Sequence, residues 1–159
     1  MVKSDCRYVS PLMKDIIMNA KTLTFLCALP LAFLSLHSLA SAETVVFKAT
    51  LSGASEVPPT ASTAKGSAVI SVDTVTKVAT YEITYSGFAD APKAAHIHGP
   101  AAAGANAGVM APFTIGASPM KGTMTLTDAQ IADVAAGKAY VNIHTTAFGG
   151  GEIRGQLAK

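Results

Sequence analysis

The sequence predicts an all-β protein: a Greek-key-like antiparallel β-sandwich with one short helix, preceded by a cleaved signal peptide. Three observations lead to this prediction. Apolar and polar residues alternate along residues 66–73 and 78–87, which is the period of half-buried antiparallel strands. Turn residues separate seven or eight such segments at intervals of about a dozen residues. A charge-free apolar run, residues 23–39, precedes them all.

Residues 1–42 have the features of a secretory leader. Lys21 precedes the apolar run, and Ala40-Ser41-Ala42 follows it as an A-x-A cleavage site. A proline and a histidine interrupt the run, which is shorter than the roughly 20 apolar residues of a membrane span. We therefore expect cleavage after Ala42, no membrane span in the processed chain, and an exported protein that is periplasmic or extracellular. The mature domain would be residues 43–159.

The formal charge of +2 belongs to the leader. Four of the 12 lysines and arginines and two of the 10 acidic residues lie in residues 1–42, which leaves eight of each sign in the mature domain. A neutral domain argues against a nucleic-acid partner, which requires a basic surface. Cys6 and Cys27 also lie in the leader. The mature domain therefore has no disulfide and no thiolate ligand, although its expected compartment permits disulfides.

Residue type and alternation predict the first four strands of the mature domain. Residues 44–51 are rich in β-branched side chains, and the paired prolines that follow predict a loop. Residues 66–73 and 78–87 alternate as described above. A short strand over residues 93–98 ends at Gly99-Pro100.

The second half of the domain contains the single predicted helix. Thr127 and Gln130 form a T-x-x-Q capping box, and Gly137 is placed to end the helix. A narrow apolar stripe predicts that this helix lies against the sheet. The remaining expected strands are 109–115, 121–126, 139–145 and 152–157, the last two as a hairpin.

The three histidines of the mature domain are candidate metal ligands. His96 and His98 are two residues apart on one strand, so their side chains leave the same face. In the strand 139–145, Val141 and Ile143 belong to the core, which places His144 on the opposite, wetter face. If the three imidazoles converge, they form a site for a borderline metal such as copper or zinc. No other cofactor is implied.

A supporting polar network is expected beside these histidines. Alternation along the strand 152–157 turns its isoleucine and leucine inward and its polar side chains outward. These side chains share a face with His144 only if the hairpin loop has an odd number of residues. A three-residue loop, 147–149, or a five-residue loop satisfies this condition. The expected network comprises Asn142, Glu152, Arg154 and Gln156.

Several segments of the mature domain resemble the CHRD domain, a module named for its repeats in chordin that also occurs alone in exported bacterial proteins. The resemblance implies an extracytoplasmic β-sandwich and implies no reaction or ligand. The segments that carry it are LSGASEVPP (51–59), HIHGPAAAGANAGV (96–109), KGTMTLTDAQ (121–130), AGKAYVNIHT (136–145) and GGEIRGQL (150–157).

Three interpretations of the histidine face stay open at this stage. The first is a hydrogen-bonded network that holds strand register, in which His144 accepts from Arg154 or a backbone amide. In that network His96 or His98 pairs with Glu152 and Asn142. The second is a metal site, and the third is a surface for another ligand or for an unknown protein or envelope component.

The sequence contains no motif of a hydrolase, metalloprotease or phosphate-binding loop, so we expect a non-enzymatic binding or structural module. One alternative is a copper-dependent redox enzyme, because the H-x-H pair is similar to the copper pair of copper-zinc superoxide dismutase, another β-sandwich. That site requires further histidines and an aspartate, so dismutase chemistry is not expected. Another alternative is a matrix or adhesion module.

Overall fold

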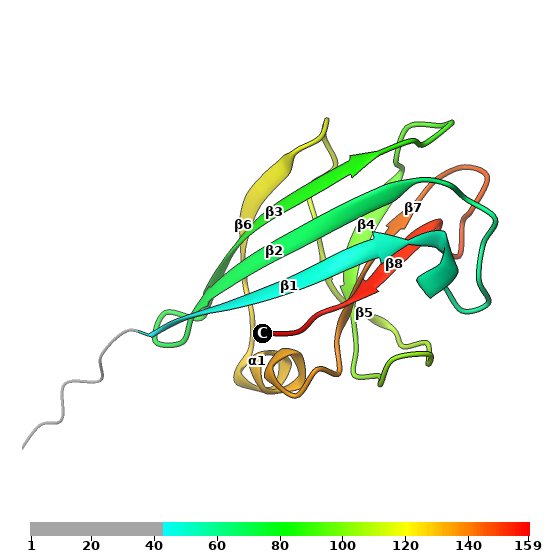
Figure 1. The fold of residues 1–159 in the computed structure, drawn as a ribbon. Coiled ribbons are helices and arrows are strands. Elements are labelled where there is room, and N and C mark those ends of the chain that lie inside the picture. Colours follow the sequence, from blue (N-terminus) through cyan, green and yellow to red (C-terminus); the bar gives the residue numbers. More distant parts are fainter. Residues whose placement is uncertain (1–42) are drawn as a thin grey trace, which may run out of the picture. The chain divides into compact units, whose positions relative to one another are not determined.

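The computed structural model describes residues 43–159, which form an eight-stranded antiparallel sheet with one α-helix and one short 3-10 helix (Figure 1). The predicted signal peptide lies outside the described residues. Within the described range, no helix has the length and hydropathy of a membrane-spanning segment. The elements are β1 (Thr44–Ser52), η1 (Gly53–Ser55), β2 (Lys65–Asp73), β3 (Val78–Ser86), β4 (Ala94–His98), β5 (Val109–Pro112), β6 (Met120–Thr125), α1 (Asp128–Ala135), β7 (Tyr140–His144) and β8 (Ile153–Gln156).

The strands follow the order β5-β4-β7-β8-β1-β2-β3-β6, and all neighbours pair antiparallel. The sheet curves strongly, so that in Figure 1 the long strands β1 to β3 lie in front of β4, β5 and β7. Tyr81 of β3 meets Phe113, just after β5, edge to face with 4.8 Å between ring centroids. The two halves of one sheet therefore enclose one core. The predicted all-β class, antiparallel pairing and single short helix are confirmed.

The core consists of the inward-facing residues of each strand. In β1, for example, Phe47, Ala49 and Leu51 are buried while Lys48 and Thr50 between them are exposed. Burial of an aliphatic or aromatic side chain contributes about 1.5–3 kcal/mol. Alternation of this kind holds the register, because a shift by one residue would expose every core side chain of the strand.

One predicted strand is shorter than expected. Residues 109–115 were predicted as a strand, but β5 ends at Pro112. Phe113 then turns into the core, and the backbone N–H of Thr114 donates to the hydroxyl of Tyr81 at 3.1 Å. The chain leaves the β5 edge here because it crosses toward β3 and β6 on the other side of the core.

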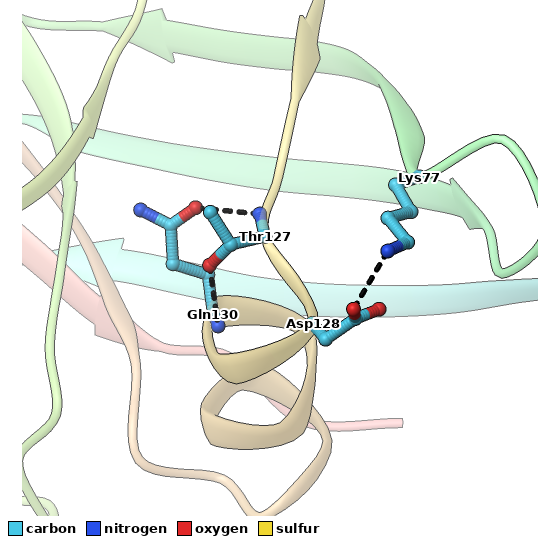
Figure 2. Close-up of polar contacts among 4 residues, drawn as sticks. All are labelled: Lys77, Thr127, Asp128 and Gln130. Atoms are coloured by element: carbon cyan, nitrogen blue, oxygen red, sulfur yellow. Dashed lines mark hydrogen bonds and ion pairs between the residues drawn. The ribbon is translucent and has the colours of Figure 1, made fainter.

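Helix α1 begins with the predicted capping box, which Figure 2 shows. The Thr127 hydroxyl accepts from the backbone N–H of Gln130 at 3.2 Å, and the Gln130 side chain accepts from the backbone N–H of Thr127 at 2.8 Å. Asp128 in the first turn pairs with Lys77 of the β2–β3 turn at 2.6 Å. After the C-cap residue, Gly137 has φ +69, the left-handed conformation that commonly ends a helix.

We predict that Thr127→Ala lowers the free energy of unfolding by about 1 kcal/mol, because the first turn of α1 loses a side-chain acceptor. Urea unfolding of the wild type and the variant measures the difference. Thr127→Ser keeps the hydroxyl and is the matched control, with stability close to wild type. Equal loss in both variants would show that the hydroxyl is not the stabilising group.

Candidate metal centre

The candidate residues lie on the face of β4, β7 and β8 that points away from the core. Residues paired across an antiparallel sheet share a face, and His96 pairs with Asn142, which in turn pairs with Arg154. In the adjacent row, His98 pairs with Tyr140, and Tyr140 pairs with Gln156. The intervening residues, such as Ile97 and Ile143, are fully buried in the core. The register therefore gathers the histidines and the expected polar residues on one side of the sheet.

The hairpin between β7 and β8 keeps the required parity but is longer than predicted. Its last paired residues are Ile143 and Ile153, so nine residues connect them instead of the three or five expected. The Thr145 hydroxyl donates to the carboxylate of Glu152 across the base of this loop. The longer loop matters for the site because Gly149 near its tip contacts His144.

The structure brings the three histidine rings together. One ring nitrogen from each of His96, His98 and His144 lies within 4.8 Å of the other two. The ring centroids are 5.4 Å apart for His96 and His98, 5.0 Å for His96 and His144, and 5.8 Å for His98 and His144. His98 is 9% exposed, whereas the other two are half-buried. The cluster thus has one ring below the surface and two at its opening.

Two backbone carbonyls determine which nitrogen of each ring faces the cluster. His98 Nδ1 lies 3.0 Å from the carbonyl oxygen of Ala107, and His144 Nδ1 lies 3.0 Å from that of Gly149. A carbonyl only accepts, so both Nδ1 atoms carry the proton and both Nε2 atoms keep a lone pair when the rings are neutral. Metal-binding histidines in proteins are oriented by the same kind of contact.

One ring nitrogen of each histidine faces the centre of the cluster. His144 Nε2 lies 3.1 Å from His96 Nδ1, which donates to it in the metal-free protein. His98 Nε2 is buried and has no hydrogen-bond partner. A buried acceptor without a partner is uncommon in native proteins and requires an explanation. A bound cation is one such explanation.

The surroundings of His96 and His144 disfavour the charged form of these two rings. Burial lowers the pKa of His96, and the neighbouring His144 and His98 lower it further. Burial also lowers the pKa of His144; the hydrogen bond to Gly149 opposes this effect and His98 adds to it. Imidazole binds a metal only in its neutral form. The lowered pKa values of His96 and His144 therefore favour the form of these two rings that can bind a metal.

The expected polar residues lie on this face, but none of their side-chain hydrogen bonds reaches a histidine. Asn142 donates to both carboxylate oxygens of Glu56, at 2.9 and 3.2 Å. Arg154 donates to the side chain of Asn106 at 3.0 Å and to the carbonyl of Ala105 at 2.8 Å. The expectation that Arg154 donates to His144 is wrong, because the loop of residues 99–108 offers it closer acceptors.

The expected pairing of His96 or His98 with Glu152 and Asn142 is also wrong. Glu152 accepts from Thr145 and from the Ser62 hydroxyl, the latter at 2.7 Å. Gln156 donates to two backbone carbonyls at 3.0 and 2.8 Å. The loops of residues 53–64 and 99–108 supply Ser62 and the Ala101 carbonyl. Asn142, Glu152 and Arg154 are buried, so this part of the face is not wet as expected.

Glu56 is the residue of this network that the sequence analysis missed. The sequence predicted only a loop for this segment, yet Glu56 is 5% exposed and bound to Asn142, 86 residues away. Burial raises the pKa of its carboxyl from 4.5 to about 7, although the positive charge of Arg154 and a backbone hydrogen bond at Val57 oppose the shift. No pattern in residues 53–64 indicates this partnership.

The fold and the site together define the class of protein: it is an all-β domain with a three-histidine cluster on the loop-covered face of its sheet. Residues 47–157 match the family model of the CHRD domain. The chain belongs to the CHRD domain family. The matched segment contains all three histidines and nearly the whole sheet. The chain has no match among the curated proteins or the solved structures with which it was compared.

Glu56 predicts a pH dependence of stability. Between pH 4.5 and about 7 the folded protein holds a proton on Glu56 that the unfolded chain releases, so this group's contribution to stability decreases as the pH rises through that window. Glu56→Gln removes the effect. The loss of unfolding free energy from pH 5 to pH 7.5 should be smaller in the variant by on the order of 1–3 kcal/mol.

Urea unfolding at the two pH values measures this difference. Glu82→Gln is the control, because Glu82 is an exposed carboxylate that pairs with Lys121 on the surface. This control should keep the wild-type pH dependence. An identical pH dependence in wild type and Glu56→Gln would contradict the assignment.

Proposed function

We propose that this CHRD protein is an exported, non-enzymatic binding module that holds one copper or zinc ion through His96, His98 and His144. The observation that carries the proposal is the convergence of three imidazoles, two of which have their tautomer set by backbone carbonyls. The unpartnered, buried Nε2 of His98 supports it independently.

The ligand set supports the choice of metal. Within residues 43–159 the cluster consists of imidazoles, without a thiolate or a carboxylate, and imidazole suits copper and zinc better than magnesium or calcium. Two nitrogens bound to one tetrahedral zinc at 2.0–2.1 Å are about 3.3 Å apart, close to the 3.1 Å between His96 Nδ1 and His144 Nε2. Binding requires the three nitrogens, which lie within 4.8 Å of one another, to move closer together, and His96 to carry its proton on Nε2.

The export proposal is supported by the leader pattern of residues 1–42. Strand β1 begins at Thr44, two residues after the expected cleavage site, so cleavage there would remove no part of the sheet. Both cysteines precede that site. The processed domain would thus meet an oxidising compartment without a thiol that could compete for copper.

We predict that the exported, purified protein, with an intact mass corresponding to residues 43–159, binds one equivalent of Cu(II) or Zn(II). His98→Ala and His144→Ala should each lower the affinity at least about 100-fold, because two imidazoles remain. Titration calorimetry or competition with a chromophoric chelator measures the affinity. For copper, the absorption and electron paramagnetic resonance spectra report nitrogen ligation.

Glu152→Gln is the matched control for this titration. Glu152 is a buried acid in the connection between β7 and β8, and its carboxylate oxygens accept from Thr145 and Ser62. The variant should retain the wild-type affinity. Failure of the wild-type protein to retain copper or zinc at pH 7.5 would overturn the proposed function.

A second candidate is a copper-dependent redox enzyme, favoured by the number of ligands. Structural zinc sites have four protein ligands, whereas catalytic metal sites have three and keep one position open. The described residues contribute three to this cluster, and two of them are half-buried at its opening. A metal held here would keep a position accessible to small molecules.

If the position is open, azide added to the copper-loaded protein should produce a ligand-to-metal charge-transfer band in the near ultraviolet and should shift the paramagnetic resonance spectrum. The position would be filled by water in the absence of azide. Unchanged spectra at saturating azide would show a closed centre, which would favour the binding module over the redox enzyme.

A further inference from the structure

We infer that Tyr140 and Arg154 are positioning residues of the histidine cluster: together they hold the Ala107 peptide that directs His98 Nε2 toward the metal position. The role in metal binding rests on the proposed function. The control of the His98 tautomer does not, because it is a property of the metal-free protein as well.

The ring of Tyr140 contacts both the His98 ring, a candidate metal ligand, and the buried guanidinium of Arg154. Its ring is stacked on the His98 ring, with centroids 5.0 Å apart and an angle of 6° between the planes. The guanidinium carbon of Arg154 lies 3.4 Å from the centroid of the Tyr140 ring. This order follows from the sheet, because β7 lies between β4 and β8. Tyr140 and Arg154 are 3% and 2% exposed, so their positions are fixed by packing.

The same two side chains hold the loop that covers His98. The Tyr140 hydroxyl accepts from the backbone N–H of Ala107 at 3.1 Å and lies 3.4 Å from its carbonyl oxygen. Arg154 binds the two preceding residues, through the Ala105 carbonyl and the Asn106 side chain. Residues 101–108 are alanine, glycine and asparagine, so the loop has no large apolar side chain to anchor it. Its position depends on these polar contacts.

The position of the Ala107 peptide determines which ring nitrogen of His98 carries the proton. The Ala107 carbonyl accepts from His98 Nδ1 at 3.0 Å, and that contact assigns the proton to Nδ1 and the lone pair to Nε2. The stacked Tyr140 ring also prevents the imidazole from turning out of its plane. If the loop moves, either nitrogen can carry the proton, and Nε2 is no longer reserved for a ligand. Contacts of this kind change metal affinity 10- to 100-fold.

The test compares two Tyr→Phe variants that remove the same kind of bond. Tyr140→Phe keeps the ring between His98 and Arg154 but removes the acceptor for Ala107 N. Tyr81→Phe is the matched control, because the Tyr81 hydroxyl accepts from the backbone N–H of Thr114 at the same distance of 3.1 Å and the residue is 5% exposed. Tyr81 lies in β3, away from the histidines.

We expect Tyr140→Phe to lower the Zn(II) affinity about 10- to 100-fold. Tyr81→Phe should leave the affinity within about twofold of wild type. The two variants should lose similar amounts of unfolding free energy, because each loses one buried hydrogen bond. Arg154→Lys keeps the charge but loses the planar stack and the fork of donors, so it should resemble Tyr140→Phe. Competition with a chromophoric zinc chelator gives the affinities.

Side-chain ¹⁵N NMR of the metal-free proteins gives a second readout. His98 should be protonated at Nδ1 in wild type and Tyr81→Phe, and should show a substantial Nε2-protonated population in Tyr140→Phe. If Tyr140→Phe matches Tyr81→Phe in both affinity and tautomer, the inference is overturned while the metal site stands. If wild type binds no zinc or copper, the proposed function fails, and the NMR result alone decides the positioning role.

Discussion

The pairing of β7 with β4 on one side and β8 on the other determines where every residue of the candidate site lies. Because both pairings are antiparallel and in register, one face of three short strands receives the histidines and the polar residues, and the other receives the core. The two rows are His96–Asn142–Arg154 and His98–Tyr140–Gln156, and the second places the Tyr140 ring against that of His98. A shift of β7 by one residue would turn Tyr140 and His144 into the core and Val141 and Ile143 out of it.

The sheet therefore separates two interiors of different character. On the concave side, apolar side chains from all eight strands pack against one another. On the other side, the loops of residues 53–64 and 99–108 cover a layer of polar groups that includes Glu56, Asn142 and Arg154, each at most 5% exposed. Such a layer is stable only when its groups are paired. Hydrogen bonds join Asn142 to Glu56 and Arg154 to the loop, whereas Asn142 Oδ1 has no partner among the described residues.

Most of the fold could be predicted from the sequence, because one-sided burial leaves a period of two in every long strand. The capping box marked the start of α1 for a similar reason, since the bonds it makes are local. The face of His144 followed from the apolar identity of Val141 and Ile143. These predictions depend on residues close together in the chain.

The remainder of the site depends on contacts that residue types do not encode. Glu56 lies in a loop without periodicity and meets Asn142 from 86 residues away. The carbonyls of Ala107 and Gly149, which orient two of the rings, are backbone atoms that almost any residue would provide. The polar face was expected to be wet because the sequence does not show that two loops fold across it. The convergence of the histidines was predictable, but the atoms that orient them were not.

The solitary Nε2 of His98 has a thermodynamic consequence. Leaving a buried acceptor unpaired costs about 1–3 kcal/mol, and the chain incurs this cost when it folds, before any ion arrives. A cation that fills the cluster recovers it, and needs to order little else. The unpaired nitrogen therefore lowers the stability of the ion-free protein, and it raises the affinity for a bound cation by a corresponding amount.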